Sequence, residues 1–505
     1  MLDTQTALYL ANRLGFGPAP GEIDRIRGLG FEACVEEQLN PKLNELPPGL
    51  SAQLKSIPSF GKDTFELFRD YWWRPHVRDA ATGEKLAREK VQLLKRVTFQ
   101  VGPQARMARM IRAIASPHRL QETLVDFWFN HFNVYERKQL DAVWIGAYEE
   151  EAIRSHTLGK FSDLLLATAK HPAMLVYLDN WRNVSPHARE GRRPPKANGV
   201  NENYAREVME LHTLGVDGGY TQADVTALAH ILTGWTVDND RAHAHRGGPN
   251  PWGDDGGPVW GGFAFRPGLH DDTPQTFLGR KFRNADYADG ETALLMLAHH
   301  PSTAKHISFQ LAQYFVADKP PQPLVDQMAS TFRSTDGDLK AVMRTMLLSK
   351  EFRDPSNFGR KFKTPYQYVV SVARASSLDP RLAAPVAEEL KILGQPIYGC
   401  LTPDGYACTE SAWLDPDAMV RRLSFAAKFG SGAYMQPHLA DLGYGTIKPK
   451  KILLQPQEGG TPIDADRLLA ALGGEISSST RSAVAKAAKA ERAGLILGSP
   501  EFMRC

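Results

Sequence analysis

Apolar residues recur along most of this chain at the three- and four-residue spacing of amphipathic α-helices. Such periods run through residues 107–114, 123–132, 161–169, 205–214, 225–232, 303–316, 339–348, 366–375, 416–429 and 483–497. Several of them end at Gly or Pro, the residues that commonly terminate helices. A further helix is predicted to begin at a capping Thr4 or Thr6 and to stop at Gly15.

The alternating pattern of β-strands is sparse. Residues 260–265 and 276–282 carry it, and we expect them to form a small hairpin around the loop RPGLHDDTPQ. Strands and helices do not alternate along the chain, which argues against an α/β protein. Four stretches have the composition of long loops: 40–62, 182–200, 238–262 and 430–463. The pattern predicts a mainly α protein, residues 1–505 forming a large single helical domain with long loops and a small β-hairpin.

Charge and hydropathy narrow the class of protein. The 60 basic and 57 acidic residues leave a net charge of +3, too near neutral for a dedicated nucleic-acid or anionic-membrane protein. No apolar run approaches the roughly 18 residues that a membrane span needs. The first residues have no basic leader and no cleavage site typical of a signal peptide, so we expect a cytoplasmic protein. Export in company with a signal-bearing partner is the alternative location.

The four cysteines do not form a metal-binding pattern. None belongs to a CxxC pair, and no Cys/His set has zinc spacing. Cys400 and Cys408 bracket a short loop, so a local disulfide is sterically feasible. In a reducing compartment two free thiols are favoured.

The first candidate for chemistry lies in the segment LVDFWFNHFNV. Trp128 and His131 fall on one helical face with other apolar residues, whereas Asp126, Asn130 and Asn133 share another face. A histidine in an aromatic stripe is usually a core residue held by one hydrogen bond, and spacing alone favours that interpretation. The alternative is a desolvated imidazole that acts as a base or a metal ligand.

A second candidate is the polar stripe of NENYAREVMELH. Asn203, Glu207 and Glu210 line one helical face, and Tyr204 lies on the neighbouring one. Two carboxylates one turn apart could share a metal or divide acid and base roles. A solvated face is favoured by spacing alone, because Arg206 can pair with Glu210. The di-iron pattern Glu-x-x-His is absent here.

The turn VDGGYTQAD that follows invites a calcium interpretation. Asp217, Thr221 and Asp224 resemble the second half of an EF-hand loop, but the first half of the ligand set is missing. A capped helix start explains the same residues better, with Thr221 as the cap and Asp224 three positions later.

Two further histidine clusters lie in predicted loops. His270 and Asp271 stand at the tip of the expected hairpin, where a metal site, a His–Asp base pair and solvated turn residues are all compatible with the pattern. His243 and His245 fit exposed loop residues better than a metal clip. The basic residues between 189 and 196 lack interleaved aromatics, so they indicate a solvated loop and no nucleic-acid surface.

Several long motifs together resemble a known family. They include LANRLGFGPAP, VDFWFNHFNV, LGKFSDLLLATAKHPAMLVYLDN, NENYAREVMELHTLGVDGGYTQADVTALAHILTGW, FRPGLHDDTPQTFLG, KFKTPYQYVVS, LGQPIYGCLTPDGYACTESAWL and SPEFM, in this order. The chain resembles, over nearly its whole length, the bacterial family called domain of unknown function 1800. The resemblance implies a helical single-domain body of bacterial origin whose polar motifs converge. It also implies a genomic neighbour, domain of unknown function 1501, similar to phosphatases and sulfatases. Gln275 departs from the lysine expected in the family.

We therefore expect a hydrolytic enzyme with a histidine–carboxylate pocket. Its catalytic residues would be His131, Glu207, Glu210, His270 and Asp271. Its walls would be Trp128, Asn130, Tyr204 and Trp235. These groups can activate water with or without a divalent metal, and a saccharide-type substrate would suit the aromatic and amide lining. The alternatives are a non-catalytic partner or chaperone of the phosphatase-like protein, with buried polar networks that fix the fold, and an iron or manganese redox enzyme.

Overall fold

The computed structural model describes residues 1–41, 46–72, 87–188, 199–238, 259–260, 262–283, 286–434 and 462–505. Helices dominate these residues and the strands are few and short, so the predicted mainly α class with a small β-hairpin is confirmed. One cluster of buried apolar side chains extends from Ala7 to Met503. The assignment of residues 1–505 to a single domain remains a prediction. Among the described residues, no helix combines the length and apolar character that crossing a bilayer requires.

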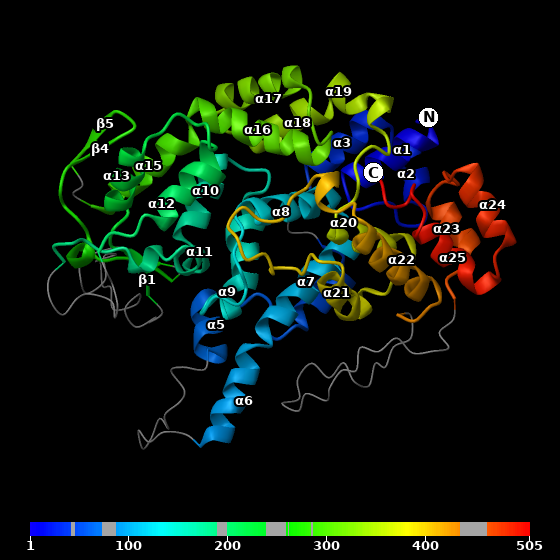
Figure 1. Ribbon diagram of the computed structural model, residues 1–505, viewed down its shortest axis with the longest axis horizontal. Coiled ribbons are helices and arrows are strands. Elements are labelled where there is room, and N and C mark those ends of the chain that lie inside the picture. Colours follow the sequence, from blue (N-terminus) through cyan, green and yellow to red (C-terminus); the bar gives the residue numbers. More distant parts are fainter. Residues whose placement is uncertain are drawn as a thin grey trace.

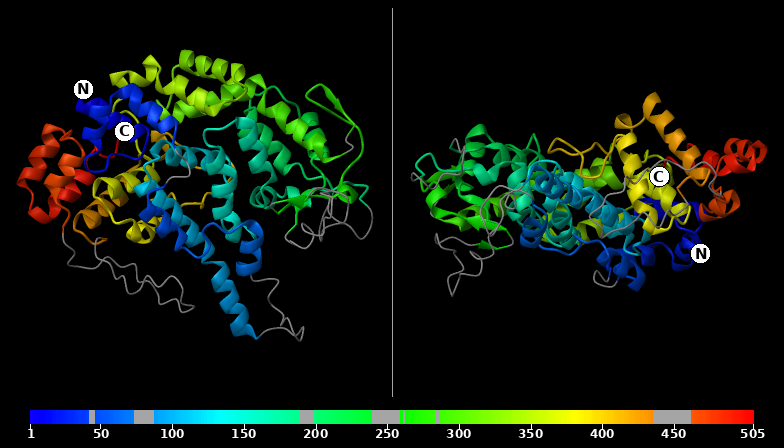
Figure 2. Two further views of the ribbon diagram at one scale, coloured as in Figure 1. Left: turned by 180° about the vertical axis from the view of Figure 1, so that it is seen from behind. Right: turned by 90° about the horizontal axis from the view of Figure 1, so that it is seen from below.

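The N-terminal helices are α1 (Thr4–Arg13), α2 (Glu22–Leu29), α3 (Phe31–Leu39), α4 (Pro48–Lys55), α5 (Thr64–Tyr71) and α6 (Arg88–Thr98). The first three helices lie at one end of an elongated, shallow body, close to the C-terminus, whereas α5 and α6 lie below its centre (Figures 1 and 2). Asp3 caps α1 by accepting a hydrogen bond from the Thr6 amide, so the prediction of a threonine cap was wrong. Helix α4 lies inside the stretch 40–62, which was expected to be a loop throughout.

The central helices carry the polar residues described below. They are α7 (Val101–Ala115), α8 (Arg119–His131), α9 (Asp141–Ala147), the π-helix η2 (Tyr148–Ile153) and the 3₁₀ turn η3 (Arg154–His156). Nearly every residue of α7 and α8 is buried, which explains why their polar side chains must find partners inside the protein. Helix α6 projects from this centre away from the body (Figure 1).

The second end of the body contains α10 (Phe161–Lys170), α11 (Pro172–Tyr177), η4 (Asn180–Arg182), α12 (Asn203–Glu207), the π-helix η5 (Val208–Thr213), α13 (Gln222–Ile231) and α15 (Tyr287–Ala298). The predicted cap of α13 is confirmed, because Thr221 and Asp224 form a reciprocal capping box. The calcium interpretation of this turn is not supported, because the Asp224 carboxylate accepts hydrogen bonds from Thr221 and from the Leu278 amide.

The strands form two small sheets at this end. β1 (Trp235–Val237), β3 (Phe263–Phe265) and β2 (Val259–Trp260) form an antiparallel sheet in that order. β4 (Gln275–Phe277) and β5 (Arg280–Phe282) form a separate hairpin that turns at Leu278 and Gly279. The prediction that residues 260–265 pair with residues 276–282 was therefore wrong. β3 pairs with β1 and β2 instead, residues 275–282 fold back on themselves, and the loop between β3 and β4 begins with η6 (Pro267–Leu269).

A row of helices joins the two ends: α16 (Pro301–Phe315), α17 (Gln322–Ser334), α18 (Leu339–Leu347) and α19 (Lys350–Arg353), followed by η7 (Pro355–Asn357) (Figure 1). The C-terminal part contains α20 (Pro365–Ala375), η8 (Pro380–Leu382), α21 (Ala383–Ile392), η9 (Glu410–Ala412), α22 (Pro416–Gly430), α23 (Ala465–Ala471), α24 (Ser478–Lys486) and α25 (Lys489–Leu497). The helix expected over 483–497 is two helices, since the chain is extended at Ala487 and Ala488. Most of the predicted loops 182–200, 238–262 and 430–463 lie outside the described residues.

Candidate functional site

His131 lies at the end of α8 as a core residue. Its side chain is buried among aromatic rings, among them Trp128 and Phe132. Nε2–H donates to the backbone oxygen of His212 at 3.1 Å, and Nδ1 lies 2.6 Å from the side-chain oxygen position of Gln310. Burial lowers the pKa of His131 to about 4, so the ring is neutral at neutral pH. A neutral ring cannot donate from both nitrogens, so the Gln310 amide must present its NH₂ group to Nδ1.

Glu207 and Glu210 lie on a half-buried face of α12 and η5. Burial, and then Glu210, raise the pKa of Glu207. Asp404 adds a further negative charge nearby. Neither glutamate lines the cavities described below. The structure therefore does not bring the predicted carboxylate stripe and His131 into one described cavity.

Asp271 does form a His–Asp pair, but with His230 of α13 and not with its neighbour His270. His230 Nδ1 lies 2.6 Å from Asp271 Oδ2, and the Asp271 side chain is 1% exposed. Against the effect of burial, hydrogen bonds from Thr273 and His230 lower the pKa of Asp271. His270 turns inward and donates through Nδ1 to the Thr233 carbonyl at 2.8 Å. Sequence proximity thus suggested the wrong histidine.

The four predicted wall residues divide into core residues and one cavity residue. Trp128, Tyr204 and Trp235 are almost fully buried and belong to the hydrophobic core. Asn130 exchanges two hydrogen bonds with the backbone of Tyr406, at 2.9 and 2.7 Å, and lines a cavity. Of the nine predicted site residues, Asn130 alone lines a described cavity.

A buried charge network surrounds Arg109 of α7. Its guanidinium lies 2.6 Å from Asp126 of α8 and 3.1 Å from Glu149 of η2. Tyr314 donates a hydrogen bond to Asp126, and Tyr398 donates one to Glu149. The Arg109 side chain is 6% exposed, so these contacts replace water almost completely.

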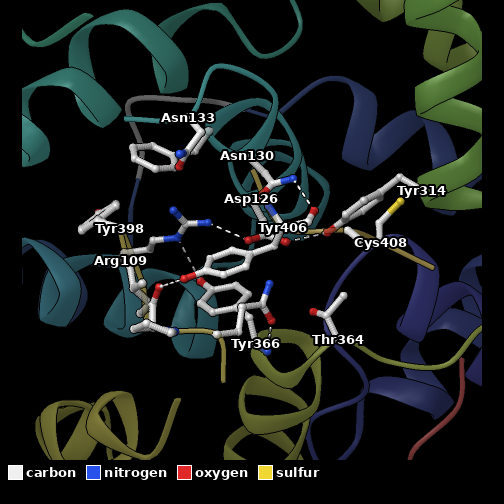
Figure 3. Close-up of a pocket in the computed structure, with 15 residues that line it drawn as sticks. Arg109, Asp126, Asn130, Asn133, Tyr314, Thr364, Tyr366, Tyr398, Tyr406 and Cys408 are labelled. Atoms are coloured by element: carbon white, nitrogen blue, oxygen red, sulfur yellow. Dashed lines mark hydrogen bonds and ion pairs between the residues drawn. The ribbon is translucent and has the colours of Figure 1, made fainter. Parts of the chain in front are cut away.

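One cavity opens beside this network, and Figure 3 shows the Arg109 guanidinium reaching Asp126 among the residues that line it. We name it the tyrosine cavity. Its aromatic wall consists of Tyr314, Tyr366, Tyr398 and Tyr406. Three chain segments that carry the family resemblance meet here, namely those around residues 125–134, 361–371 and 393–414. These three motifs share one cavity, whereas the segments that carry Glu207 and His270 do not line it.

The tyrosine cavity is small. Its volume of about 40 Å³ accommodates a few water molecules, given roughly 10–15 Å³ for each. Burial raises the pKa of Asp126, while Arg109 and the Tyr314 hydroxyl oppose that rise. Burial also raises the pKa of Tyr366, which keeps its phenol protonated. The cavity is therefore suited to ordered water beside neutral donors and a paired carboxylate.

A second cavity lies on the other side of Arg109 and Tyr398, which line both. We name it the glutamate cavity. It has a volume of about 200 Å³, and η2 contributes three consecutive acidic side chains to it: Glu149, Glu150 and Glu151. The wider turn of a π-helix is rare and occurs frequently at functional sites.

The three glutamates of η2 differ in their partners. Glu149 and Glu150 are held by arginines from neighbouring elements, Glu150 by Arg112 at 2.9 Å. Among the described residues, Glu151 has only His171, the N-cap residue of α11, within ion-pair distance, at 3.8 Å. Surrounding protein atoms, then Asp63 and Glu150, raise the pKa of Glu151 to about 7. Because its side chain is still 45% exposed at the cavity, Glu151 can exchange protons near neutral pH.

Sequence reasoning missed most of these residues, although part of the signal was present. Asp126 and Asn133 were placed on one helical face with Asn130, and all three line the tyrosine cavity. The acidic run of η2 stands between apolar residues, which is unusual for a solvated face. Arg109 carried no such signal, since an arginine in an amphipathic helix is normally exposed.

Within the described ranges, no three His, Cys, Asp or Glu side chains gather closely enough to hold a metal ion. All four cysteines are free thiols, as was favoured for Cys400 and Cys408.

Comparison with curated proteins and with solved structures gives no match. The model of the family described as protein of unknown function (DUF1800) matches residues 9–504, nearly the whole chain, so the protein belongs to this family.

Proposed function

We propose that the protein is a hydrolytic enzyme of the acid–base type that works at the glutamate cavity, with Glu151 as the group that transfers the proton. The observation that carries the proposal is the position of Glu151. Its carboxyl group borders a cavity of about 200 Å³ and is not neutralised by an arginine, unlike Glu149 and Glu150 beside it. A residue with a perturbed pKa in a cavity is a candidate for catalysis.

The surroundings suit proton transfer to or from water. Above its pKa of about 7 the Glu151 carboxylate can take a proton from a water molecule, and below it the acid can protonate a leaving group. A positioned general acid or base of this kind contributes about 10²–10⁴-fold to a rate. The charge network around Arg109 holds η2 in place at the back of the cavity. The proposed reaction class is still hydrolysis, as expected from the sequence. The proposed catalytic residue is now Glu151, which replaces the five residues inferred from their spacing in the sequence.

Cavity size limits the substrate. Sites for drug-sized molecules usually have about 300–1,000 Å³, so about 200 Å³ fits a small molecule or one end of a longer one. A saccharide-type substrate would enter with a single ring. The apolar side chains of Leu67, Val101 and Val143 line the same space and would contact the uncharged part of the substrate.

The test is a hydrolysis screen with matched variants. Wild type, Glu151→Gln and Glu491→Gln are compared on chromogenic ester, phosphate and glycoside substrates between pH 5 and 9. Glu491 is an exposed residue of α25, and no residue of α25 lines the glutamate cavity. The Glu491→Gln variant therefore controls for the loss of one carboxylate. We expect activity on one substrate class, retained by the control and lowered at least about 100-fold by Glu151→Gln. Equal activity of all three proteins on that class would refute the role of Glu151.

A second proposal is a non-catalytic role as partner of the phosphatase-like protein. It is favoured by an apolar ridge on the C-terminal helices, where Val420, Leu423 and Leu495 are 61%, 49% and 40% exposed. Leu423 and Leu495 lie on packed helices, since Leu423 approaches Gly498 one turn after Leu495. Co-expression with the phosphatase-like neighbour tests it. A stoichiometric complex that Leu423→Glu abolishes would support the partner role, and separate elution of the two proteins would remove it.

A further inference from the structure

His171 begins helix α11 in an unusual way. Its Nδ1 atom accepts a hydrogen bond from the Ala173 amide at 3.1 Å, so the imidazole acts as the helix cap before Pro172. An accepting Nδ1 places the single proton of a neutral ring on Nε2. Burial lowers the pKa of His171 to about 3, so the ring is neutral throughout the physiological range.

The Nε2–H group of His171 lies close to Glu151 but forms no hydrogen bond with it. The ring is 5% exposed and rests against Tyr148, with ring centroids 5.1 Å apart. Nε2 has no hydrogen-bond partner at normal distance among the described residues, and Glu151 Oε2 lies 3.8 Å away. A buried N–H without an acceptor is unfavourable. A shift of the exposed Glu151 side chain by less than 1 Å would complete the bond, at the usual length of about 3 Å.

We propose that His171 is a positioning residue that holds the ionised Glu151 carboxylate against its Nε2–H group, at the edge of the glutamate cavity, and releases it on protonation. The inference rests on the proposed function of Glu151. A carboxylate accepts this hydrogen bond better than a neutral acid does, so the bond favours the charged form. Glu151 thereby has two positions, held against His171 when ionised and turned to the cavity when protonated.

Other charged groups around Glu151 do not replace this contact. Asp63 at the start of α5 and Glu150 of η2 both disfavour the ionised form. The cations that line the cavity have carboxylate partners of their own. Lys62 pairs with Asp70, and Arg109 pairs with two acids of the charge network. Among the described residues, the His171 ring is the group that lies within ion-pair distance of Glu151, with Nε2 at 3.8 Å from Oε2.

Two variants separate positioning from folding. His171→Asn keeps an acceptor for the Ala173 amide, because asparagine is a good N-cap, but its shorter amide withdraws the donor from Glu151. His171→Gln reaches farther and restores a donor near the Nε2 position. His300→Asn is the matched control, since His300 caps α16 before Pro301 through the same 3.1 Å bond to the Ser302 amide.

The experiment measures the ionisation of Glu151 directly. Full-length protein labelled with ¹³C at the glutamate carboxyl carbon is titrated by NMR, and the Glu151 signal is identified by its absence from Glu151→Gln. We expect His171→Asn to raise the midpoint of Glu151 by about one pH unit or more, whereas His171→Gln and His300→Asn leave it near the wild-type value. An unchanged midpoint in His171→Asn would overturn the proposal. Because the titration needs no substrate, this outcome is independent of whether Glu151 catalyses hydrolysis.

Discussion

Replacement of Arg109 by methionine would test the buried charge network most directly. Arg109→Met keeps a long side chain in the same space but removes the positive charge between Asp126 and Glu149. Those carboxylate side chains are only 12% and 2% exposed, so water cannot replace the guanidinium. The loss of one partner from a buried ion pair typically costs about 3–5 kcal/mol, and we expect a loss in this range.

A double-mutant cycle separates charge from packing. Asp126 has Arg109 and Tyr314 as its hydrogen-bond partners, so Asp126→Asn in the Arg109→Met background removes one stranded charge. The double variant should be more stable than Arg109→Met by about 1–3 kcal/mol, although Asp126→Asn alone destabilises the wild type. Arg25→Met is the control. Arg25 pairs with Glu37 at the surface, where both side chains are over 40% exposed, and its loss should cost under about 1 kcal/mol.

The assay is equilibrium urea unfolding followed by fluorescence and circular dichroism. The nine tryptophans provide the fluorescence signal. A free energy of unfolding is derived only if the two curves coincide, because a chain of this size can unfold in stages. An Arg109→Met variant as stable as Arg25→Met, or a cycle without coupling, would refute the view that the network stabilises the centre of the fold.

Three other predictions concern stability. Burial raises the pKa of Asp141, whose carboxyl oxygens have no hydrogen-bond partner among the described residues, so ionisation favours the unfolded chain above about pH 4. Asp141→Asn should therefore be about 1–3 kcal/mol more stable than wild type at pH 7 in thermal or urea unfolding, with a difference that shrinks toward pH 4 and is absent for the exposed Asp163→Asn. The pKa of His131 is lowered to about 4 in the folded state, so the free energy of unfolding falls by roughly 1.4 kcal/mol per pH unit as pH falls from 6.5 to about 4. His131→Gln should make the free energy of unfolding less dependent on pH in this range, and parallel profiles of the two proteins would contradict this. Gly405 has a φ of 70°, and a Cβ on it would lie 2.7 Å from Asn130 Oδ1, so Gly405→Ala should cost at least about 1–3 kcal/mol, which denaturant unfolding would reveal.

The sequence by itself determined the features that depend on neighbouring residues. The apolar periods placed most of the long helices, and Thr221 with Asp224 marked the start of α13 correctly. These features are local, because a helix face and a cap involve residues at most a few positions apart. The prediction was wrong where several neighbouring residues could cap the same helix. At α1 the N-cap is Asp3 and neither Thr4 nor Thr6.

Only the tertiary structure decided which polar groups meet. Asn130 bonds the backbone of Tyr406, which is 276 residues away, and Tyr314 reaches Asp126 across 188 residues. Asp271 pairs with His230, 41 positions earlier, in preference to the adjacent His270. Such pairs depend on the packing of whole helices and on how far burial removes each group from water, which no spacing rule encodes. The motifs were sufficient to identify the family, because they can be recognised in the sequence. Glu151 became the candidate acid–base group only through the cavity and the charges beside it, which the tertiary structure creates.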